Sequence, residues 1–496
     1  MKRSLRSSMN LLPGSPELFA LVAVLLILMP VALPVLSAQT SFPSLDADPR
    51  ALDYSSRTAY SWQDLAETAL WASGSGDNAS FMERLREAAA EIGPAAPADT
   101  LERGEYILNY IHRRFLMSYS ERQTRMDLLF STGRYNCVSS AVLYMILAVS
   151  AGLDVSGVMT RDHAFVTVRS GTELIDVETT NRYGFDPGHR KDFHDDFGRT
   201  TGFAYVPARN YRDRSAINQL ELISLILSNR ISEAESRGRY AEAVSLALDR
   251  AALLPAGSAA AGSPFLGNPR RDLLNSLYNF GGALIRNGRE EDALRWAALA
   301  GEKYPEGERW QEMIFAALNN LITKLIRAQK ISEAREALVR HTPVLSSGNF
   351  VKIDTVVLEA ELIRQCAGAS SAEEAEAALE ALAASASRFP KSRIDELRSM
   401  VIIKEGERRI SAGAYPEAAA YIEESLSRYG PDSRLNTALR VFRANRVSEF
   451  HNAFAAFYNR GNYEEARRII QEGLKEFPGQ RQLSSDLGLV ERVLRN

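Results

Sequence analysis

The sequence predicts an α+β domain followed by an all-α helical array, with an export segment before both. Three observations lead to this prediction. An uncharged apolar run follows the basic N-terminal residues, short β-type runs gather between residues 155 and 177, and one helical motif recurs after residue 216. A chain of 496 residues also favours two or three domains over one. The predicted parts are an export segment (1–38), a linker (39–56), the α+β domain (57–215) and the helical array (216–496).

The composition excludes several classes of protein. Apolar residues make up 45% of the chain and charged residues 24%, as in ordinary globular proteins, so sizeable cores can form. A net charge of -3 lacks the basic excess of a nucleic-acid binder. The two cysteines, Cys137 and Cys366, lie in different predicted domains, so we expect no structural disulfide. No cysteine or histidine cluster has metal-ligand spacing, and we expect neither a metal nor a cofactor.

The N-terminal segment has the features of an export signal. Three basic residues precede the apolar run Leu18 to Leu36, which ends at the small residues Ser37 and Ala38. Two prolines interrupt the run and favour a cleaved signal peptide, although its length also permits an uncleaved anchor. In both cases the positive-inside rule places the rest of the chain outside the cytoplasm. We therefore expect a periplasmic or secreted protein, with membrane attachment through residues 18–36 as the alternative to cleavage.

The predicted α+β domain begins with helices and continues with strands. Apolar residues recur at helical spacing over residues 57–93 and 102–115, and again in the longer stretch Val138 to Ala151. Strands are predicted where β-type residues gather between turn signals, at Val155–Met159, Ala164–Val168 and Leu174–Val177, with a last edge strand at Tyr205–Pro207.

A motif of five or six residues recurs through residues 216–496. A small or polar residue is followed by an aromatic or basic residue, two acidic or polar residues and then alanine, as in Gly238–Ala243, Gly288–Ala293 and Gly461–Ala466. This resembles the second helix of a tetratricopeptide repeat, although the copies are about 41 to 50 residues apart. The resemblance implies a solenoid of stacked helix pairs whose concave surface binds a protein partner. A generic helical bundle is the alternative.

Cys137 stands where the long helix Val138–Ala151 is predicted to begin. A thiol at that position faces the positive end of the helix dipole and several free backbone N–H groups. Both favour the thiolate, which is the nucleophilic form, and the N–H groups can also hold an oxyanion. Cys137 is therefore the predicted nucleophile.

His163, at the start of a predicted strand, is the predicted base for this nucleophile. If Ser170 and Gly171 form a two-residue hairpin loop, the paired residue numbers sum to 341 and His163 lies opposite Glu178. Asp176 is then on the same face, one diagonal step away, because side chains alternate along a strand. Either carboxylate is able to accept a hydrogen bond from the imidazole and orient it.

These residues resemble the transglutaminase-like superfamily, which has a papain-type fold. The likeness lies in Gly133-x-x-x-Cys137 opening a long helix, in His163-Ala164-Phe165, and in Val177-Glu178-Thr179-Thr180. Family members usually have His-Ala-Trp and Val-Asp-x-Thr at the last two places, so glutamate replaces aspartate here. The resemblance covers about residues 105–210 and implies a Cys–His–Asp/Glu triad for acyl transfer at an amide.

The sequence thus predicts an exported enzyme, a cysteine peptidase, amidase or transglutaminase, that acts on a peptide or protein. Cys137 is the nucleophile, His163 the base, and Glu178 or Asp176 the third member, while the helical array binds a partner protein. The alternative is a non-catalytic scaffold of the cell envelope, in which the transglutaminase-like domain is a binding module. The rate at which Cys137 is alkylated, and its dependence on His163, distinguishes the two.

Overall fold

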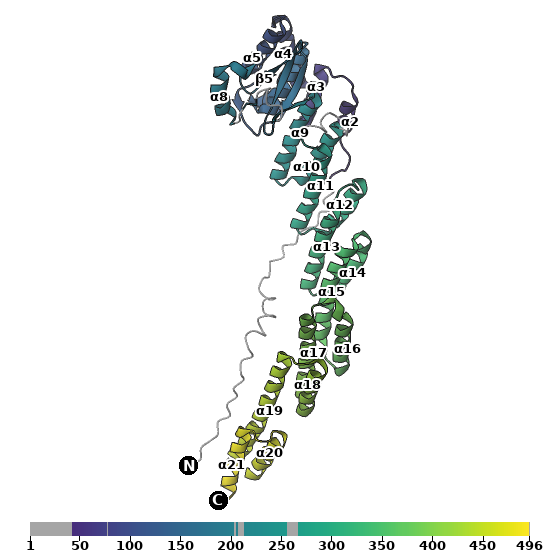
Figure 1. Ribbon diagram of the computed structural model, residues 1–496, viewed down its shortest axis with the longest axis vertical. Helices are drawn as coiled ribbons and strands as arrows, with labels where there is room; N and C mark the ends of the chain where they lie inside the picture. The colour runs from purple at the N-terminus through teal and green to yellow at the C-terminus, as the bar shows by residue number, and fades with distance from the viewer. Residues whose placement is uncertain (1–41, 77, 203–204, 207–212, 255–265, 496) are drawn as a thin grey trace. The chain divides into compact units, whose positions relative to one another are not determined.

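The computed structural model describes residues 42–76, 78–202, 205–206, 213–254 and 266–495, which are mostly helical with a small region of β-sheet (Figure 1). The described chain divides into two compact units. The first comprises residues up to 321 with 343–346, and the second comprises 322–342 with 347–495. The predicted export segment 1–38 lies outside the described residues. From Phe42 onward, no described helix is both long enough and apolar enough to cross a bilayer.

Helix α7 (Cys137–Ser150) is the central helix of the first unit. All residues from Val138 to Ala148 are buried, which explains why this helix is apolar on every side. Helices α3, α4, α5 and α9 and strands β3 and β4 all pack against it. The helices before the sheet are α2 (Pro49–Ser56), α3 (Trp62–Ala72), α4 (Ala79–Ala95), α5 (Thr100–Arg114) and α6 (Met126–Thr132).

The main sheet is antiparallel and has the strand order β5-β4-β3-β6. A separate pair of two-residue parallel strands, β1 and β2, leads into α7. Three predicted strands are found, one with identical bounds and two within two residues. The strands are β1 (Ser118–Tyr119), β2 (Arg134–Tyr135), β3 (Val155–Met159), β4 (Ala164–Ser170), β5 (Glu173–Val177) and β6 (Ser215–Ile217).

The hairpin between β4 and β5 differs from its predicted register by two residues. Val166 pairs with Val177 and Ser170 with Glu173, so the paired numbers sum to 343 and not to 341. The loop is therefore Gly171-Thr172, and Gly171 has the positive φ of 61° that a tight hairpin turn requires. Because the shift is even, every side chain stays on its predicted face.

The predicted edge strand at Tyr205–Pro207 is wrong. Tyr205 and Val206 belong to no strand, and Pro207 lies outside the described residues. The edge beside β3 is occupied by β6 instead, through the pairing of Gly157 with Ile217. Between β5 and β6 the chain forms the short helix η1 (Pro187–His189) and helix α8 (Lys191–Thr201).

The predicted linker 39–56 packs on the fold where it is described. Asp48 caps helix α2, and its backbone N–H donates a 2.8 Å hydrogen bond to Asp249 of helix α10. The ring of Phe42 contacts that of Trp296 in helix α12, with 5.6 Å between centroids. Prolines and aspartates, which suggested a linker, also suit a helix N-terminus.

The repeated motif begins in the turn between two paired helices. It ends at an alanine that is buried where the two helices pack together. Gly238, Gly288 and Gly461 have φ between 73° and 77° in these turns, where a side chain would be strained. The alanine that ends each copy is buried, at Ala243, Ala293, Ala334, Ala375, Ala418 and Ala466. In the first unit these helices are α9 (Gln219–Ser236), α10 (Tyr240–Leu253), α11 (Pro269–Arg286) and α12 (Glu290–Lys303).

The described part of the second unit is built from helices, each packed against the next. Two clusters of buried apolar side chains form its core, and Cys366 lies in the first of them. Helix α13 (Trp310–Arg327) runs across the division between the units. The other helices are α14 (Ile331–His341), η4 (Thr342–Val344), α15 (Ser347–Gly368), α16 (Ala372–Ser385), η5 (Ala386–Arg388), α17 (Lys391–Ser411), α18 (Tyr415–Tyr429), α19 (Ser433–Asn459), α20 (Tyr463–Glu476) and α21 (Arg481–Arg495).

Candidate functional site

Cys137 is the first residue of helix α7, as the sequence predicts. Asn136 caps the helix: its side chain accepts a 3.0 Å hydrogen bond from the N–H of Ser139, and its backbone carbonyl accepts from Ser140. The N–H groups of Cys137 and Val138 make no hydrogen bond to any described residue. A partly exposed thiol thus lies beside two free donors at the positive end of a helix.

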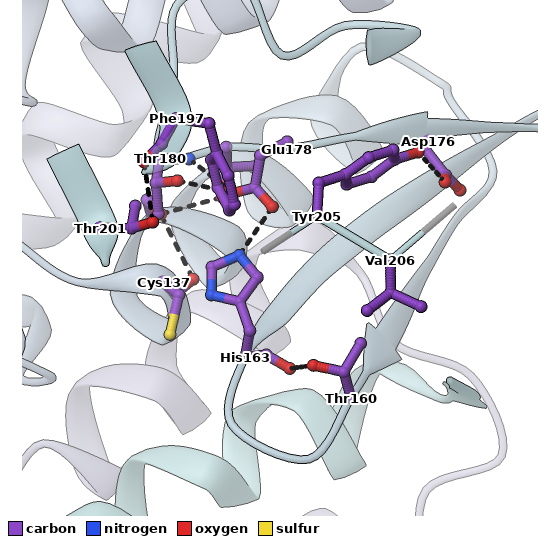
Figure 2. Close-up of polar contacts among 12 residues, drawn as sticks. Cys137, Thr160, His163, Asp176, Glu178, Thr180, Phe197, Thr201, Tyr205 and Val206 are labelled. Atoms are coloured by element: carbon purple, nitrogen blue, oxygen red, sulfur yellow. Dashed lines mark hydrogen bonds and ion pairs between the residues drawn. The ribbon is translucent and has the colours of Figure 1, made fainter. Parts of the chain in front are cut away.

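His163 lies in the turn between β3 and β4, with its ring buried. Its backbone carbonyl accepts a 2.8 Å hydrogen bond from the N–H of Thr160, which fixes the turn. One ring nitrogen, Nε2, is 2.6 Å from Oε2 of Glu178. The other ring nitrogen, Nδ1, is on the side of the ring towards Cys137 (Figure 2). The imidazole therefore lies between the thiol and the carboxylate.

Glu178 is fully buried directly after strand β5, and both of its oxygens are occupied. Oε1 accepts hydrogen bonds from the backbone N–H and the hydroxyl of Thr180, at 3.2 and 2.7 Å. Oε2 faces Nε2 of His163. Because three donors surround the group, the carboxylate form satisfies every contact, and the Nε2–H of His163 is the donor to it.

Charge around His163 favours its protonated form. Burial alone lowers the pKa of an imidazole, but the carboxylate of Glu178 and the side chain of Cys137 act against burial more strongly. Together they raise the pKa of His163 from 6.5 to about 10.

Asp176, the other predicted partner of His163, is occupied elsewhere. Its two oxygens each accept a 2.8 Å hydrogen bond from Arg214, and one also accepts from the hydroxyl of Tyr205 at 2.5 Å. The guanidinium of Arg214 in turn lies 5.0 Å from the ring centroid of Phe165. Asp176 lies on the face of the sheet that the sequence predicts. On that face its carboxylate forms a bidentate ion pair with Arg214 and does not bond to His163.

A cleft of about 700 Å³ opens at Cys137 and His163. Charges of both signs line it, among them Glu121, Arg122 and Arg161. Its other wall is formed by helix α9, the first helix of the predicted array, and the residue that caps its C-terminus. The lining residues from this wall are Leu225, Ser228, Asn229, Ser232, Glu233, Ser236 and Arg237. The predicted domain boundary at 215–216 therefore falls between two segments that line one cleft.

The structure brings together three of the four predicted site residues, Cys137, His163 and Glu178, and separates Asp176 from them. Sequence reasoning missed Tyr119, which lines the cleft from the two-residue strand β1. So short a strand carries no periodic signal. The wall formed by α9 was missed because it depends on a contact between segments about 90 residues apart in the chain.

Comparison with known proteins adds no further assignment. No family model matches the chain, and no curated protein matches it. The chemistry of Cys137, His163 and Glu178 is therefore the basis for inferring a function.

Proposed function

We propose that this protein is an exported thiol acyl-transfer enzyme that acts on an amide of a peptide or protein. The single observation that carries this proposal is the imidazole of His163, which contacts Cys137 on one side and buried Glu178, at 2.6 Å, on the other. A nucleophile, a base and an acceptor that orients the base are the three parts that such chemistry needs. The proposal includes a transglutaminase-like fold for residues 105–210, as the sequence resemblance implies.

In the first step the thiolate of Cys137 attacks the amide carbonyl carbon, and a C–S bond forms. The π electrons of the carbonyl move to its oxygen, and the free N–H groups of Cys137 and Val138 stabilise the negative charge. The imidazolium of His163 then gives its proton to the amide nitrogen, the C–N bond breaks, and the amine leaves. A thioester on Cys137 remains.

In the second step water or a primary amine attacks the thioester. Neutral His163 takes a proton from the attacking group as the new C–O or C–N bond forms, and the C–S bond breaks. The thiolate and the imidazolium are then restored. Water makes the enzyme a peptidase or amidase, and an amine makes it a transglutaminase.

The helical array fits this proposal as a surface for a protein partner or substrate. Stacked helix pairs form extended concave surfaces, and the buried alanines of the repeated motif allow the paired helices to approach closely. Helix α9 belongs both to the predicted array and to the wall of the cleft.

Alkylation with iodoacetamide tests the proposal. The wild-type protein should be labelled at Cys137 at pH 6 nearly as fast as at pH 8, because the imidazolium of His163 maintains the thiolate. His163→Ala should slow labelling at pH 6 by about 10²-fold, since an ordinary thiol is less than about 1% ionised there. Mass spectrometry of the labelled peptides measures both rates.

Two internal controls accompany this measurement. Cys366 is a buried thiol whose pKa is raised by burial to about 11, so it should remain unlabelled in the folded protein. His451 also contacts a carboxylate, Asp486 at 2.7 Å, and His451→Ala should leave the labelling of Cys137 unchanged. Equally slow labelling of wild type and His163→Ala would refute the enzyme and favour the scaffold.

A further inference from the structure

Tyr119 lines the cleft that holds Cys137 and His163. Its oxygen is buried and has no hydrogen-bond partner among the residues that the structure describes. A buried donor without an acceptor costs free energy, and native proteins rarely retain one without a reason. A ligand oxygen that enters the cleft would supply the missing acceptor.

The position of Tyr119 is fixed by the same short strands that lead into helix α7. Tyr119 pairs with Tyr135 in the parallel β1–β2 register, and their rings meet edge to face with 5.9 Å between centroids. The N–H of Ser120 donates a 2.7 Å hydrogen bond to the carbonyl of Tyr135. Since Tyr135 is two residues before Cys137, one rigid stretch positions both the phenol and the thiol.

The phenol is suited to donate a hydrogen bond and not to give up its proton. Burial, followed by the nearby negative charge of Cys137 and Glu121, raises the pKa of Tyr119 well above its usual value. It therefore stays a neutral O–H donor at any pH at which the thiolate and imidazolium exist.

We propose that Tyr119 is a catalytic residue that donates its O–H to the oxyanion formed when Cys137 attacks a carbonyl. This inference rests on the proposed function and adds a third donor to the N–H groups of Cys137 and Val138. In that step the C–S bond forms and the carbonyl π electrons move to oxygen. The Tyr119 proton stays on the phenol, and His163 supplies the proton for the leaving group.

Two small reagents separate this role from a structural one. p-Nitrophenyl acetate acylates a thiolate through a tetrahedral oxyanion and releases p-nitrophenolate, whereas iodoacetamide alkylates it by displacement of iodide and forms no oxyanion. Tyr119→Phe should lower the acylation rate by about 10²-fold, the usual cost of losing one oxyanion donor, and leave the alkylation rate unchanged. Cys137→Ser gives the background rate of ester hydrolysis.

Tyr135→Phe is the matched control, because its hydroxyl already has a partner, the carbonyl of Thr180 at 3.3 Å. It should leave the ratio of acylation to alkylation rates as in wild type. The inference is overturned if Tyr119→Phe leaves both rates unchanged, or if it lowers both equally, since the phenol would then act on the thiolate or on folding.

Failure of the proposed function gives a different result. In that case Cys137 of the wild-type protein is alkylated slowly, and His163→Ala does not alter the rate. The proposed role of Tyr119 is then refuted together with the proposed function. Circular dichroism melting curves of each variant verify that the rates compared belong to folded protein.

Discussion

Cys137 and Cys366 both lie on helices, yet their surroundings differ in every respect that matters for thiol chemistry. Cys137 begins helix α7, lines a cleft and contacts the imidazole of His163. Cys366 lies near the end of helix α15, fully buried among apolar side chains, where burial raises its pKa to about 11. The comparison teaches that a helix N-terminus beside an imidazole suits a cysteine for reaction, whereas burial among apolar side chains disfavours the reactive thiolate.

The largest expected effect comes from replacing the two cysteines in turn. Cys137→Ser should abolish acylation by p-nitrophenyl acetate, because a serine hydroxyl is not ionised by an imidazolium. Cys366→Ser should leave acylation unchanged and lower the free energy of unfolding by about 1–3 kcal/mol, the cost of burying a hydroxyl. Ester kinetics and urea unfolding of both variants measure this. If Cys366→Ser lost acylation while Cys137→Ser kept it, Cys366 and not Cys137 would be the reactive cysteine.

The next effect separates two carboxylates on one face of the sheet. Glu178→Gln should slow alkylation of Cys137 at pH 6 by about 10²-fold, because His163 loses the charge that raises its pKa. Asp176→Asn should instead lower the free energy of unfolding by about 3–5 kcal/mol, since Arg214 is left buried without its partner.

Alkylation rates at pH 6 and urea unfolding of both variants provide the data. The assignment of the third member to Glu178 is wrong if Asp176→Asn slows alkylation in a still-folded protein while Glu178→Gln does not.

A smaller effect concerns pH and stability. The folded-state pKa of His163 is raised from 6.5 to about 10, so this imidazole binds its proton more tightly in the folded protein than in the unfolded chain. This contribution to stability is complete below pH 6.5 and is lost as the pH rises towards 10. The free energy of unfolding should fall by at most about 1.4 kcal/mol per pH unit from this group.

Urea unfolding of Cys137→Ser and of the double variant Cys137→Ser/His163→Gln between pH 6 and pH 10 isolates the contribution, because no thiolate then offsets the proton on His163. Cys137→Ser should show the steeper decline. Parallel curves would mean that Glu178 does not keep the imidazole charged.

The smallest effect tests access to Cys137. Ser232 lies on the α9 wall of the cleft, and Ser232→Trp should slow labelling by a bulky peptidyl chloromethyl ketone several-fold while iodoacetamide reacts normally. Ser245→Trp is the matched control, because Ser245 is also an exposed helical serine bonded to the carbonyl four residues earlier, but outside the cleft. Equal labelling of both variants would exclude α9 from the access route.

Much of the local structure could be predicted from the sequence. The helix that begins at Cys137 and the strand Val155–Met159 follow from apolar spacing and from the glycine stop at Gly152. The hairpin register was wrong by two residues, because both Ser170-Gly171 and Gly171-Thr172 are reasonable two-residue loops. The even shift left Glu178 on the face of His163, so this part of the site survived the error.

The remaining parts of the site could not be predicted, because they depend on contacts between segments that are distant in the chain. The choice between Glu178 and Asp176 is decided by Arg214, which is 38 residues beyond Asp176 and has no sequence signal of its own. Tyr119 lies in a strand of two residues, too short for any periodicity. In each case a side chain acquires its role only when the chain folds back.

Helix α9 has a practical consequence for anyone who isolates the α+β part of this protein. Its residues Leu222, Ile223 and Ile226 are fully buried, and it packs on α7 and β3 while also walling the cleft. A fragment truncated at residue 215 would lack α9. The apolar surfaces of α7 and β3 that α9 covers would then be exposed to solvent, and Cys137 would lose one wall of its cleft. We expect such a fragment to aggregate and its thiol to oxidise. The shortest useful fragment must extend through α9 and its partner α10.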